Sequence, residues 1–414
     1  AGRYSDPGFC MGKDMGALDG IRILSFNHFL SGPAAAQHLA DMGADVIAIE
    51  PIGGAFQRNW AVANRFVDET SVNHITTGRN KRSLALDLKA PAALDAVKRL
   101  IATADVVMEN FRPGTMDKLG LGEAELRRIN PRIIYAATTG YGADGPYAKR
   151  PGQDVLLQAM TGLAAHTGSL EGGPVAIGTV PIDHHAAALT AGGIVAALFE
   201  RERTGTARKV EVNMLQAALD LQGESITAWM NGANRKGPRG EAGLANWFSP
   251  APYGIHAVKD GHVMISMCKP ADLAGPLDLP ELAAFTEEDG FSRRGEIATL
   301  VQQGMARLTM AEALPLLEAA GVWHTPVEDY DALPENPQVK HLGAFVEAET
   351  RGGASMVMLA HPVRYDGETP AIRMTPPALG QHSRELLAEA GLGQDEIDAL
   401  IETGAAAQTD RMRG

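Results

Sequence analysis

The first 140 residues alternate short apolar runs with stretches of helical character, and this alternation restricts the fold more than any other feature. The run GIRILSFN at 20–27 is typical of a buried strand, and SGPAAAQHLADMG at 31–43 is typical of a helix that Ser31 caps and that carries Pro33 in its first turn. A second strand, DVIAIE, follows at 45–50. A strand, a helix and another strand in this order predict a parallel unit.

Three further strands continue the alternation, and a helix at 90–104 with Pro91 at its start separates the first two of them. Strands that alternate with helices along one chain predict an α/β fold with a doubly wound parallel sheet. These expected strands are RSLALDL at 82–88, DVVMENF at 105–111 and RIIYAATTGYG at 132–142.

Glu50 ends the second expected strand, where a dinucleotide-binding protein places an acid for the ribose. The turn after the first strand contradicts that interpretation. Its sequence, NHFLSGPAAA at 27–36, contains one glycine, Gly32, where the dinucleotide fingerprint has three. The sequence therefore argues against a nicotinamide-dependent dehydrogenase.

The composition narrows the class of protein. The 414 residues exceed one ordinary core and indicate two or three domains. The formal net charge of −13 argues against a nucleic-acid-binding surface, although a local cluster of Arg and Lys can still bind phosphate. Two cysteines, Cys10 and Cys268, provide no disulfide framework and fit a reducing compartment, so we expect a cytoplasmic protein.

Membrane and metal sites are not expected. No apolar run reaches the ~20 residues of a membrane-spanning helix, and residues 1–20 are polar and Gly-rich, which is typical of a loose arm rather than a secretory signal. The only close pair of histidines, His184 and His185, would point to different sides of a helix. No motif has the spacing of metal ligands, so we expect no metal.

The later part of the chain contains a predicted domain boundary, a hairpin and a C-terminal helix. The stretch at 231–254, NGANRKGPRGEAGLANWFSPAPYG, predicts a domain boundary because Gly, Pro and Arg dominate it. The next segment, 253–267, has the pattern of a hairpin with Asp260–Gly261 at its turn. Residues 383–404, SRELLAEAGLGQDEIDALIETG, have the pattern of one amphipathic C-terminal helix.

Asp183 stands directly before a long Ala- and Gly-rich helix, within VPIDHHAAALTAGGIVAALFERERTG at 180–205. Asp is a favoured N-cap, so helix capping is the ordinary interpretation. A carboxylate is also a nucleophile of covalent catalysis. A helix N-terminus favours negative charge by ~0.3–1 kcal/mol, so both interpretations share one physical cause.

Basic residues recur in the expected loops at strand ends. They occur in GRNKRS at 78–83, in ENFRPG at 109–114 and at Lys149–Arg150. Because ligands of an open parallel sheet collect at the carboxyl ends of its strands, Arg112 and Lys118 are the best candidates to hold an anionic, phosphate-bearing ligand. The alternative is that all of these residues are ordinary solvated surface charges.

A set of motifs, taken in order, resembles the family III CoA transferases, the carnitine dehydratase/bile-acid-inducible group. The resemblance runs from Leu18 to about Glu402, and a set in this order is far more specific than any single motif. The matching segments are LDGIRILSFNHFLSGPAAAQHLADMGADVIAIE, NKRSLALDLK, ENFRPG, TGYGADGPYAKRPGQD, AMTGLAAHTG, the block from Asp183 through FERERTG to KVEVNML, PYGIHAVKDG and GVWHTPVEDYDALPENPQV.

The resemblance implies a fold and an assembly. It implies an interlocked homodimer whose subunits each have a Rossmann-like large domain, made from both ends of the chain, and a smaller α+β domain from its middle. The implied CoA-binding large domain comprises residues 1–222 and 340–414, and the small domain with its linkers comprises 223–339. Two chains that thread each other would also account for the glycines at 148–202, since two backbones must pass closely.

The resemblance also implies an activity. In the family an aspartate matched here by Asp183 attacks the thioester of an acyl-CoA to form a mixed anhydride, then carries CoA as an aspartyl thioester until an acceptor carboxylate takes it over. We therefore expect a transferase that moves CoA to a free carboxylic acid, with CoA as a substrate and no permanently bound cofactor. Succinyl-CoA and small dicarboxylic acids are the expected substrates, and no nucleic acid or membrane is an expected partner.

The CoA-binding residues are implied position by position. The chain departs from oxalate-using members at Leu30, where they have Gln, and Pro51 replaces a basic residue of some members, so formyl-CoA:oxalate exchange is not expected. Lys118 falls where some members place a basic residue on phosphate. The implied residues are Phe29, Leu30, Ser31, Leu86, Asp87, Leu88, Lys89, Asn110, Phe111, Arg112 and Lys118, together with Arg150 and with Gln153 as a lining residue of the acyl pocket.

A racemase branch of the family provides the alternative function. Its members move the α-proton of an acyl-CoA with a His–Asp pair and the aspartate that matches Asp183. Here Gln153 stands at the His position and cannot accept and return a proton, while Asp154 remains. Asp154 can equally be a cap or an ion-pair partner, and His184 and His185 can line the acyl pocket or be structural residues of the helix, so these roles stay open.

Overall fold

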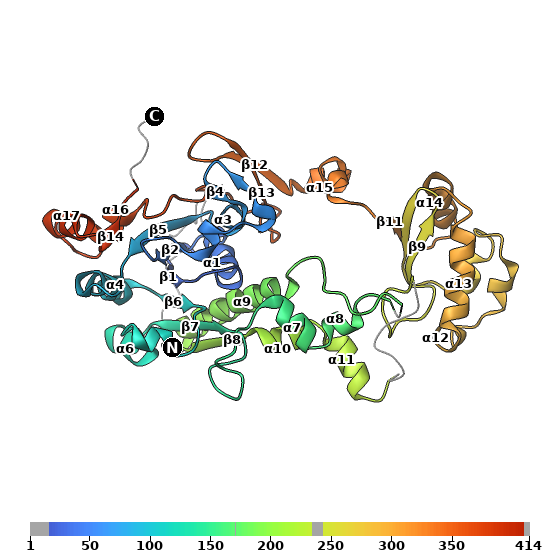
Figure 1. Ribbon diagram of the computed structural model, residues 1–414, viewed down its shortest axis with the longest axis horizontal. Helices are drawn as coiled ribbons and strands as arrows, with labels where there is room; N and C mark the ends of the chain where they lie inside the picture. The colour runs from blue at the N-terminus through green and yellow to red at the C-terminus, as the bar shows by residue number, and fades with distance from the viewer. Residues whose placement is uncertain (1–15, 170, 234–242, 410–414) are drawn as a thin grey trace, which may run out of the picture. The chain divides into compact units, whose positions relative to one another are not determined.

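A computed structural model describes residues 16–169, 171–233 and 243–409 of the protein (Figure 1). The chain divides into two compact units. The first unit runs to Gly152 and resumes at Ile182–Ala217 and from Gln338 onward, and the second comprises Gln153–Pro181 and Ala218–Pro337. The domain prediction assigned 153–181 to the large domain, whereas the structure groups this stretch with the second unit.

The first unit is built on a seven-stranded sheet with the order β14-β5-β2-β1-β6-β7-β8. All neighbours are parallel except β14, which is antiparallel to β5. The predicted parallel sheet is therefore confirmed, and its strand order reverses between β1 and β6. The strands are β1 (Arg22–Phe26), β2 (Asp45–Glu50), β5 (Lys81–Leu86), β6 (Val106–Glu109), β7 (Ile134–Thr139), β8 (Lys209–Asn213) and β14 (Ala406–Ala407).

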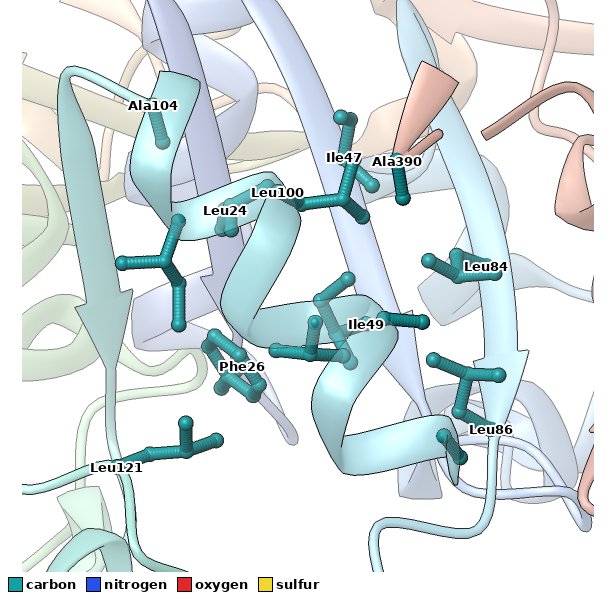
Figure 2. Packing of buried hydrophobic residues seen from close by; sticks show 14 of the residues in the cluster. Leu24, Phe26, Ile47, Ile49, Leu84, Leu86, Leu100, Ala104, Leu121 and Ala390 are labelled. Carbon is teal, nitrogen blue, oxygen red and sulfur yellow. The ribbon is translucent and has the colours of Figure 1, made fainter. Parts of the chain in front are cut away.

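Alternate side chains of the central strands enter two separate cores, one on each face of the sheet. Leu24 and Phe26 of β1 belong to the core that α4, α16 and α17 cover, and Figure 2 shows helix α4 lying over these strands. Ile23 of the same strand belongs to the core that α1 and α9 cover. Because successive strand side chains point to opposite faces, helices must cover both sides of a buried parallel sheet.

The helices that lie wholly or mainly in the first unit vary greatly in length, and α9, with 24 residues, is the longest of the described helices. They are α1 (Ser31–Asp41), α2 (Phe56–Asn59), α3 (Val72–Thr77), α4 (Pro91–Thr103), α5 (Thr115–Lys118), α6 (Glu123–Ile129), α9 (Pro181–Thr204), α10 (Met214–Asp220), α15 (Pro337–Leu342), α16 (Ser383–Glu389) and α17 (Gln394–Glu402).

Helix α9 is long and apolar enough to cross a membrane by length and composition, which the sequence analysis did not anticipate. One such helix is weak grounds for a membrane segment, because a core helix passes the same test. Of the apolar 18-residue stretch of α9 that passes this test, 44% is buried inside the protein. Ala187, Ala191 and Ile194 of this helix pack in the core between α9 and the sheet.

The second unit has its own small core around a three-stranded antiparallel sheet of order β11-β10-β9. Strands β9 (Gly254–Val258) and β10 (Gly261–Ile265) form the predicted hairpin, with Lys259 and Asp260 between them. Strand β11 (His324–Pro326) completes the sheet. The helices are α7 (Asp154–Met160), α8 (Leu163–His166), α11 (Gly223–Met230), α12 (Asp289–Ser292), α13 (Arg294–Met305) and α14 (Met310–Ala319).

Two local predictions are wrong. Ser31 is the first residue of α1 rather than its cap, and Leu30 precedes the helix without a side-chain capping bond. The C-terminal helix is two helices, α16 and α17, separated by a turn in which Gly391 has a φ of 80°. Glycine adopts this conformation readily, so it ends α16 where a continuous helical pattern was expected.

Two small antiparallel pairs complete the fold, β3 (Phe66–Val67) with β4 (Thr70–Ser71) and β12 (Phe345–Glu349) with β13 (Ser355–Leu359).

Candidate active site

A cavity of about 340 Å³ lies in the first unit where the four neighbouring strands β5, β2, β1 and β6 end. This is the edge at which an open parallel sheet binds its ligands, next to the point where the strand order reverses. The volume suits part of a nucleotide-sized ligand. Five residues expected to bind CoA line the cavity, and they are Leu86, Asp87, Leu88, Lys89 and Phe111.

The loop after β5 is a tight turn held by Asp87. Its Oδ1 accepts a hydrogen bond from the backbone N–H of Lys89 at 3.0 Å, and its carbonyl accepts from the N–H of Ala90 at 2.9 Å. Asp commonly forms such turns with its own side chain. The strand was expected to continue to Leu88, but it ends at Leu86, and the turn that replaces its last residues leaves Lys89 exposed at the cavity.

The loops after β1 and β6 are fastened to each other at the switch point. The backbone N–H of His28 donates to Asn110 Oδ1, and Asn110 Nδ2 donates to the carbonyl of His28, both at 2.8 Å. The ring of Phe111 meets the ring of His28 edge-on at 5.3 Å between centroids. Asn110 is therefore a structural link between two loops that the sequence analysis assigned to CoA.

Phe29 lies in a left-handed conformation with a φ of 60°. This conformation costs a bulky residue about 1–3 kcal/mol, so neighbouring contacts must hold it in place. Its exposed ring packs against Phe56 at 4.2 Å between centroids, and Phe56 stacks on Trp60 at 5.6 Å. These three rings form an exposed aromatic row beside the cavity, of which Phe56 is a lining residue.

Leu30 and Ser31, the other two residues expected in this loop, do not line the cavity. Leu30 packs against the core on the α1 face of the sheet. Ser31 is 3% exposed, and its Oγ has no hydrogen-bond partner among the described residues.

Three cations around the cavity are available for an anion. Lys89, Arg112 and Lys118 are exposed, and within the described parts of the chain none of them forms an ion pair. Lys89 lines the cavity itself, whereas Arg112 follows the lining residue Phe111 and Lys118 precedes the lining residue Leu119. Exposed Arg and Lys side chains without an ion-pair partner are suited to bind phosphate.

The basic stretch at 78–83 does not join them. It lies at the amino end of β5, and its cations are committed internally. Arg79 forms a buried ion pair with Asp41 at 2.7 Å, and Lys81 Nζ donates to the carbonyl of Pro33 at 2.6 Å. Arg82 pairs with Asp45, Glu385 and Glu389. These contacts argue against an anionic ligand at this stretch, because Arg79 and Arg82 already pair with carboxylates and Lys81 is bonded to a carbonyl.

Glu50 explains why the dinucleotide pattern at the second strand is misleading. Its carboxylate accepts from Arg58 Nε at 2.5 Å and Nη2 at 2.7 Å and from Ser83 Oγ at 2.7 Å. Burial opposes its ionisation, but the ion pair with Arg58 and these hydrogen bonds outweigh burial and lower the pKa of Glu50. A carboxylate saturated by protein donors has no acceptor left for a ribose.

Asp183 lies inside the first turn of α9 and not before it. The helix begins at Pro181, a residue suited to a first helical position, so Asp183 is the third residue of the helix and not its N-cap. Its side chain is half-buried. The dipole of a 24-residue helix favours the ionised carboxylate at this position, which is the form a nucleophile requires.

The two histidines after Asp183 differ in their surroundings. His184 is exposed and His185 is half-buried. Burial and the neighbouring His361 lower the pKa of His38 of α1, and His184 adds to that effect, so these three histidines lie near one another. His38 Nδ1 is 3.3 Å from His361 Nε2. No group of residues in the described segments has the arrangement of a metal site.

The remaining predicted residues lie outside the cavity. Arg150 is exposed in the first unit, and its guanidinium lies 3.9 Å from the ring centre of Tyr147. Gln153 and Asp154 belong to the second unit. Gln153 is exposed before α7, whereas Asp154 is buried and its Oδ1 accepts from Gln158 Nε2 at 2.5 Å. The bond within α7 supports the structural interpretation of Asp154.

The segment after β2 also lines the cavity, and of its residues only Pro51 was singled out from the sequence. Ile52, Gly54, Ala55 and Phe56 line the cavity, and they follow β2, which lies between β5 and β1 in the sheet. The rule that ligands collect at the carboxyl ends of parallel strands could have found them, since this segment follows the end of β2. His28 and Asn27 were missed although they precede the predicted residue Phe29.

Comparison with known proteins identifies the family. The model of CoA-transferase family III matches residues 18–383. The chain is 32% identical over 408 residues to an acyl-CoA transferase of Fusarium pseudograminearum, covering 95% of this chain and 89% of that protein. It is also 32% identical over 404 residues to succinyl-CoA:glutarate CoA-transferase of Mus musculus, covering 95% and 91%.

The fold agrees with this assignment. A crystal structure of a CAIB/BAIF family protein from Brucella suis matches with a TM-score of 0.79 and 28% identity, covering 91% of this chain and all of that one. With a family model and relatives that span nearly the whole chain, the protein belongs to CoA-transferase family III.

Proposed function

We propose that this protein transfers CoA from an acyl-CoA to a free carboxylic acid through covalent intermediates on Asp183. The observation that carries the proposal is the position of Asp183, a half-buried carboxylate in the first turn of the long helix α9, in the segment that matches the family's nucleophile. The comparisons support the class of reaction, and the helix dipole supports an ionised nucleophile.

The proposed reaction balances without a proton donor or acceptor. An oxygen of Asp183 attacks the thioester carbonyl of the donor, the C–S bond breaks, and CoA thiolate leaves an acyl–aspartyl anhydride. The thiolate then attacks the aspartyl carbonyl and releases the donor acid as its carboxylate, which forms an aspartyl-CoA thioester. The acceptor carboxylate repeats these two steps in reverse and leaves with CoA, so that the carboxylate of Asp183 is restored.

The cavity at the ends of β5, β2, β1 and β6 is the proposed site for the nucleotide end of CoA. Lys89, Arg112 and Lys118 would bind its phosphates, and Phe111 and Leu88 would contact its base and ribose. Succinyl-CoA as donor and a small dicarboxylic acid as acceptor remain the proposed substrates, in agreement with the mouse relative, a succinyl-CoA:glutarate CoA-transferase.

We also propose the interlocked homodimer. Large apolar side chains on α9, α10 and α11 are exposed in the single chain, and Phe199 and Met230 are 63% and 71% exposed. An added Cβ at Gly192 of α9 would meet no atom within 4 Å, which leaves room for a second backbone. Such apolar exposure is typical of a subunit interface. Light scattering coupled to gel filtration tests this assembly. The expected mass is that of a dimer, and the mass of a monomer would contradict the proposal.

The cytoplasmic location is part of the same proposal. It rests on the absence of a disulfide framework in the sequence and on Cys268, whose thiol is half-buried and whose pKa burial raises to about 12. A thiol of this kind is unreactive. Fractionation of the source cells would check the location.

The covalent step is testable by trapping. The full-length protein is incubated with succinyl-CoA and quenched with hydroxylamine, which converts an aspartyl anhydride or thioester into a hydroxamate, and peptides are then mapped by mass spectrometry. Modification of Asp183 is the expected result, and Asp183→Asn is the control that must stay unmodified. An enzyme that turns over while Asp183 remains unmodified would contradict the covalent scheme.

A separate incubation of the same protein tests for the racemase reaction. Incubation with an acyl-CoA in deuterated water, without an acceptor acid, would incorporate deuterium at the α-carbon if a racemase were present. Under the proposed function no deuterium enters, because no step involves that proton.

A further inference from the structure

Glu109 ends β6 and is 7% exposed, yet it lies one residue before the CoA-assigned loop and does not line the cavity at the switch point. Its two oxygens have different partners. Oε2 accepts the backbone N–H of Phe111 at 2.6 Å, and Oε1 accepts the hydroxyl of Tyr135 on the adjacent strand β7 at 3.0 Å. A buried carboxylate therefore connects the loop after β6 to the framework of the sheet.

The bond to Phe111 closes a turn of three residues, with Asn110 at its centre. The side chain of Asn110 makes both hydrogen bonds to the backbone of His28, and the side chain of Phe111 lines the cavity. A change in the direction of this turn would move both residues together. Arg112, the exposed cation, is the next residue along the chain.

The groups that face Glu109 come from several elements. Tyr135 lies on β7, Lys209 on β8 and Asp117 on α5, and these three residues and Glu109 line a second cavity of about 300 Å³. Burial raises the pKa of Glu109 to about 7, although the hydrogen bonds from Phe111 and Tyr135 and the charge of Lys209 lower it. Burial of a carboxyl group costs free energy unless hydrogen bonds replace its water, and here the bonds from Phe111 and Tyr135 do so.

We propose that Glu109 is a positioning residue for CoA, whose carboxylate holds the Asn110–Phe111 turn in the shape that the nucleotide end requires. The inference rests on the proposed function, since it concerns the same CoA site. Glu109 does not touch the ligand in this arrangement. It acts through the backbone N–H of Phe111, and Tyr135 holds its other oxygen.

The chemistry of this contact distinguishes three substitutions. Glu109→Gln keeps an amide oxygen for the Phe111 N–H and places an NH₂ beside Tyr135, whose hydroxyl can accept instead of donate, so both bonds can persist. Glu109→Asp keeps the charge but withdraws the acceptor by one methylene. Glu109→Ala removes the acceptor and leaves the Phe111 N–H without its partner.

The test measures binding of free CoA to the full-length protein by calorimetry, and the KM for succinyl-CoA and kcat with an acceptor acid. We expect Glu109→Ala to weaken CoA binding about tenfold, Glu109→Asp several-fold and Glu109→Gln less than about twofold, with the loss appearing in KM and little in kcat. The matched control is Glu123→Ala, which removes an acid of the same second cavity that makes no bond to the turn.

Each result decides the inference. Equal CoA affinity of the Ala, Asp and wild-type proteins overturns it, and so does a loss in the Gln protein as large as in the Ala protein, since that would mean that charge rather than geometry matters. If Glu109→Ala does not fold, the comparison of Asp with Gln gives the same decision. A wild-type protein that binds no CoA would contradict the proposed function instead, which is a different outcome from wild-type-like binding by the variants.

Discussion

Asn110 and His28 exchange two hydrogen bonds of 2.8 Å, one in each direction, and so join the loops that follow β6 and β1. These strands are neighbours in the sheet and lie on the two sides of the point where the strand order reverses. The crevice at such a point is where open α/β sheets bind ligands. The side chain of Asn110 therefore fixes the two loops to each other at the edge of the candidate CoA site.

Loss of this link should weaken CoA binding. We expect Asn110→Ala to reduce CoA affinity about tenfold, because the two half-buried groups of His28 lose their partners at about 1–3 kcal/mol. Calorimetric titration with CoA measures the change. Asn213→Ala is the matched control, since Asn213 also makes two hydrogen bonds, but both are to Gln216, three residues along the chain, and they join no loops of the CoA cavity. Similar losses in both variants would contradict the role of the link.

The nucleophile should affect turnover and not CoA binding. We expect Asp183→Asn to lower kcat by at least about 1,000-fold, because an amide cannot form the anhydride, while CoA affinity stays within about twofold. Initial rates and calorimetry on the same protein provide both values. Asp154→Asn is the comparison, and it should retain turnover per folded molecule because Asp154 serves a bond to Gln158 within its own helix. Loss of turnover in that variant alone would favour a chemical role for Asp154.

The unpaired cations should bind phosphate electrostatically. We expect Lys89→Ala to weaken CoA binding about tenfold at low ionic strength and less in concentrated salt, because exposed charges are screened by ions. The experiment is a titration with CoA at several salt concentrations. Arg99→Ala removes a surface cation of α4 that pairs only with Asp95 among the described residues, so it should leave the affinity unchanged. A salt-independent loss in Lys89→Ala would mean that the lysine acts by packing.

Arg79 should matter for stability rather than for CoA. Its guanidinium and the carboxylate of Asp41 are 4% and 2% exposed. Removal of one partner leaves a buried charge unpaired, so we expect Arg79→Met to lower the free energy of unfolding by about 3–5 kcal/mol. Replacing both residues, as in Arg79→Met with Asp41→Leu, should recover part of that loss. Urea unfolding measures both proteins, and weakened CoA binding by the folded single variant would revive the phosphate interpretation of this stretch.

The stability of the fold should depend on pH through Glu109. Burial raises its pKa to about 7, above the ordinary carboxyl range, so the folded state holds this proton more tightly than the unfolded state. Its contribution is complete at acidic pH below the unfolded pKa and is lost as the pH rises through about 7, a change of up to about 3 kcal/mol. Glu109→Gln cannot lose a proton, so its Tm relative to wild type should rise between pH 5 and 8.

The comparison with wild type at each pH is necessary because Lys81 titrates with the opposite effect. Burial lowers the pKa of Lys81 to about 7, so its own contribution to stability grows as the pH rises. Both proteins contain Lys81, and its effect cancels in their difference. A Tm difference that stays constant across this pH range would show that Glu109 keeps an ordinary pKa.

Much of the site could be predicted from sequence because the end-of-strand rule depends only on the order of strands and loops. Leu86–Lys89 and Phe111 lie at or directly after the carboxyl ends of predicted strands, and the structure brings them to one cavity. The same rule separates Lys89, which follows β5, from Arg79, which precedes it, but it could not show that Arg79 is already paired inside the fold. The partner of Arg79 is Asp41, a residue 38 positions away in sequence that only packing brings to its side.

Asp183 shows a second limit of local patterns. Its sequence is compatible with a cap, but α9 begins at Pro181, and the family resemblance rather than the local pattern favoured the nucleophile. Gln153 and Asp154 lie in a stretch that the sequence joined to the large domain and the structure groups with the second unit. Periodicity reports which face of an element is apolar, but it carries no information about which element that face will contact.

The sequence by itself determined the parallel sheet, the order of its loops and the family to which the protein belongs, because strand and helix periodicities and motif order are local properties of the chain. Tertiary structure alone decided which charges are neutralised, as in Arg79 with Asp41 and Arg58 with Glu50, and which remain available, as in Lys89. The physical reason is that the energy of a charge depends on the burial and partners that distant segments provide, and no local stretch of sequence contains them.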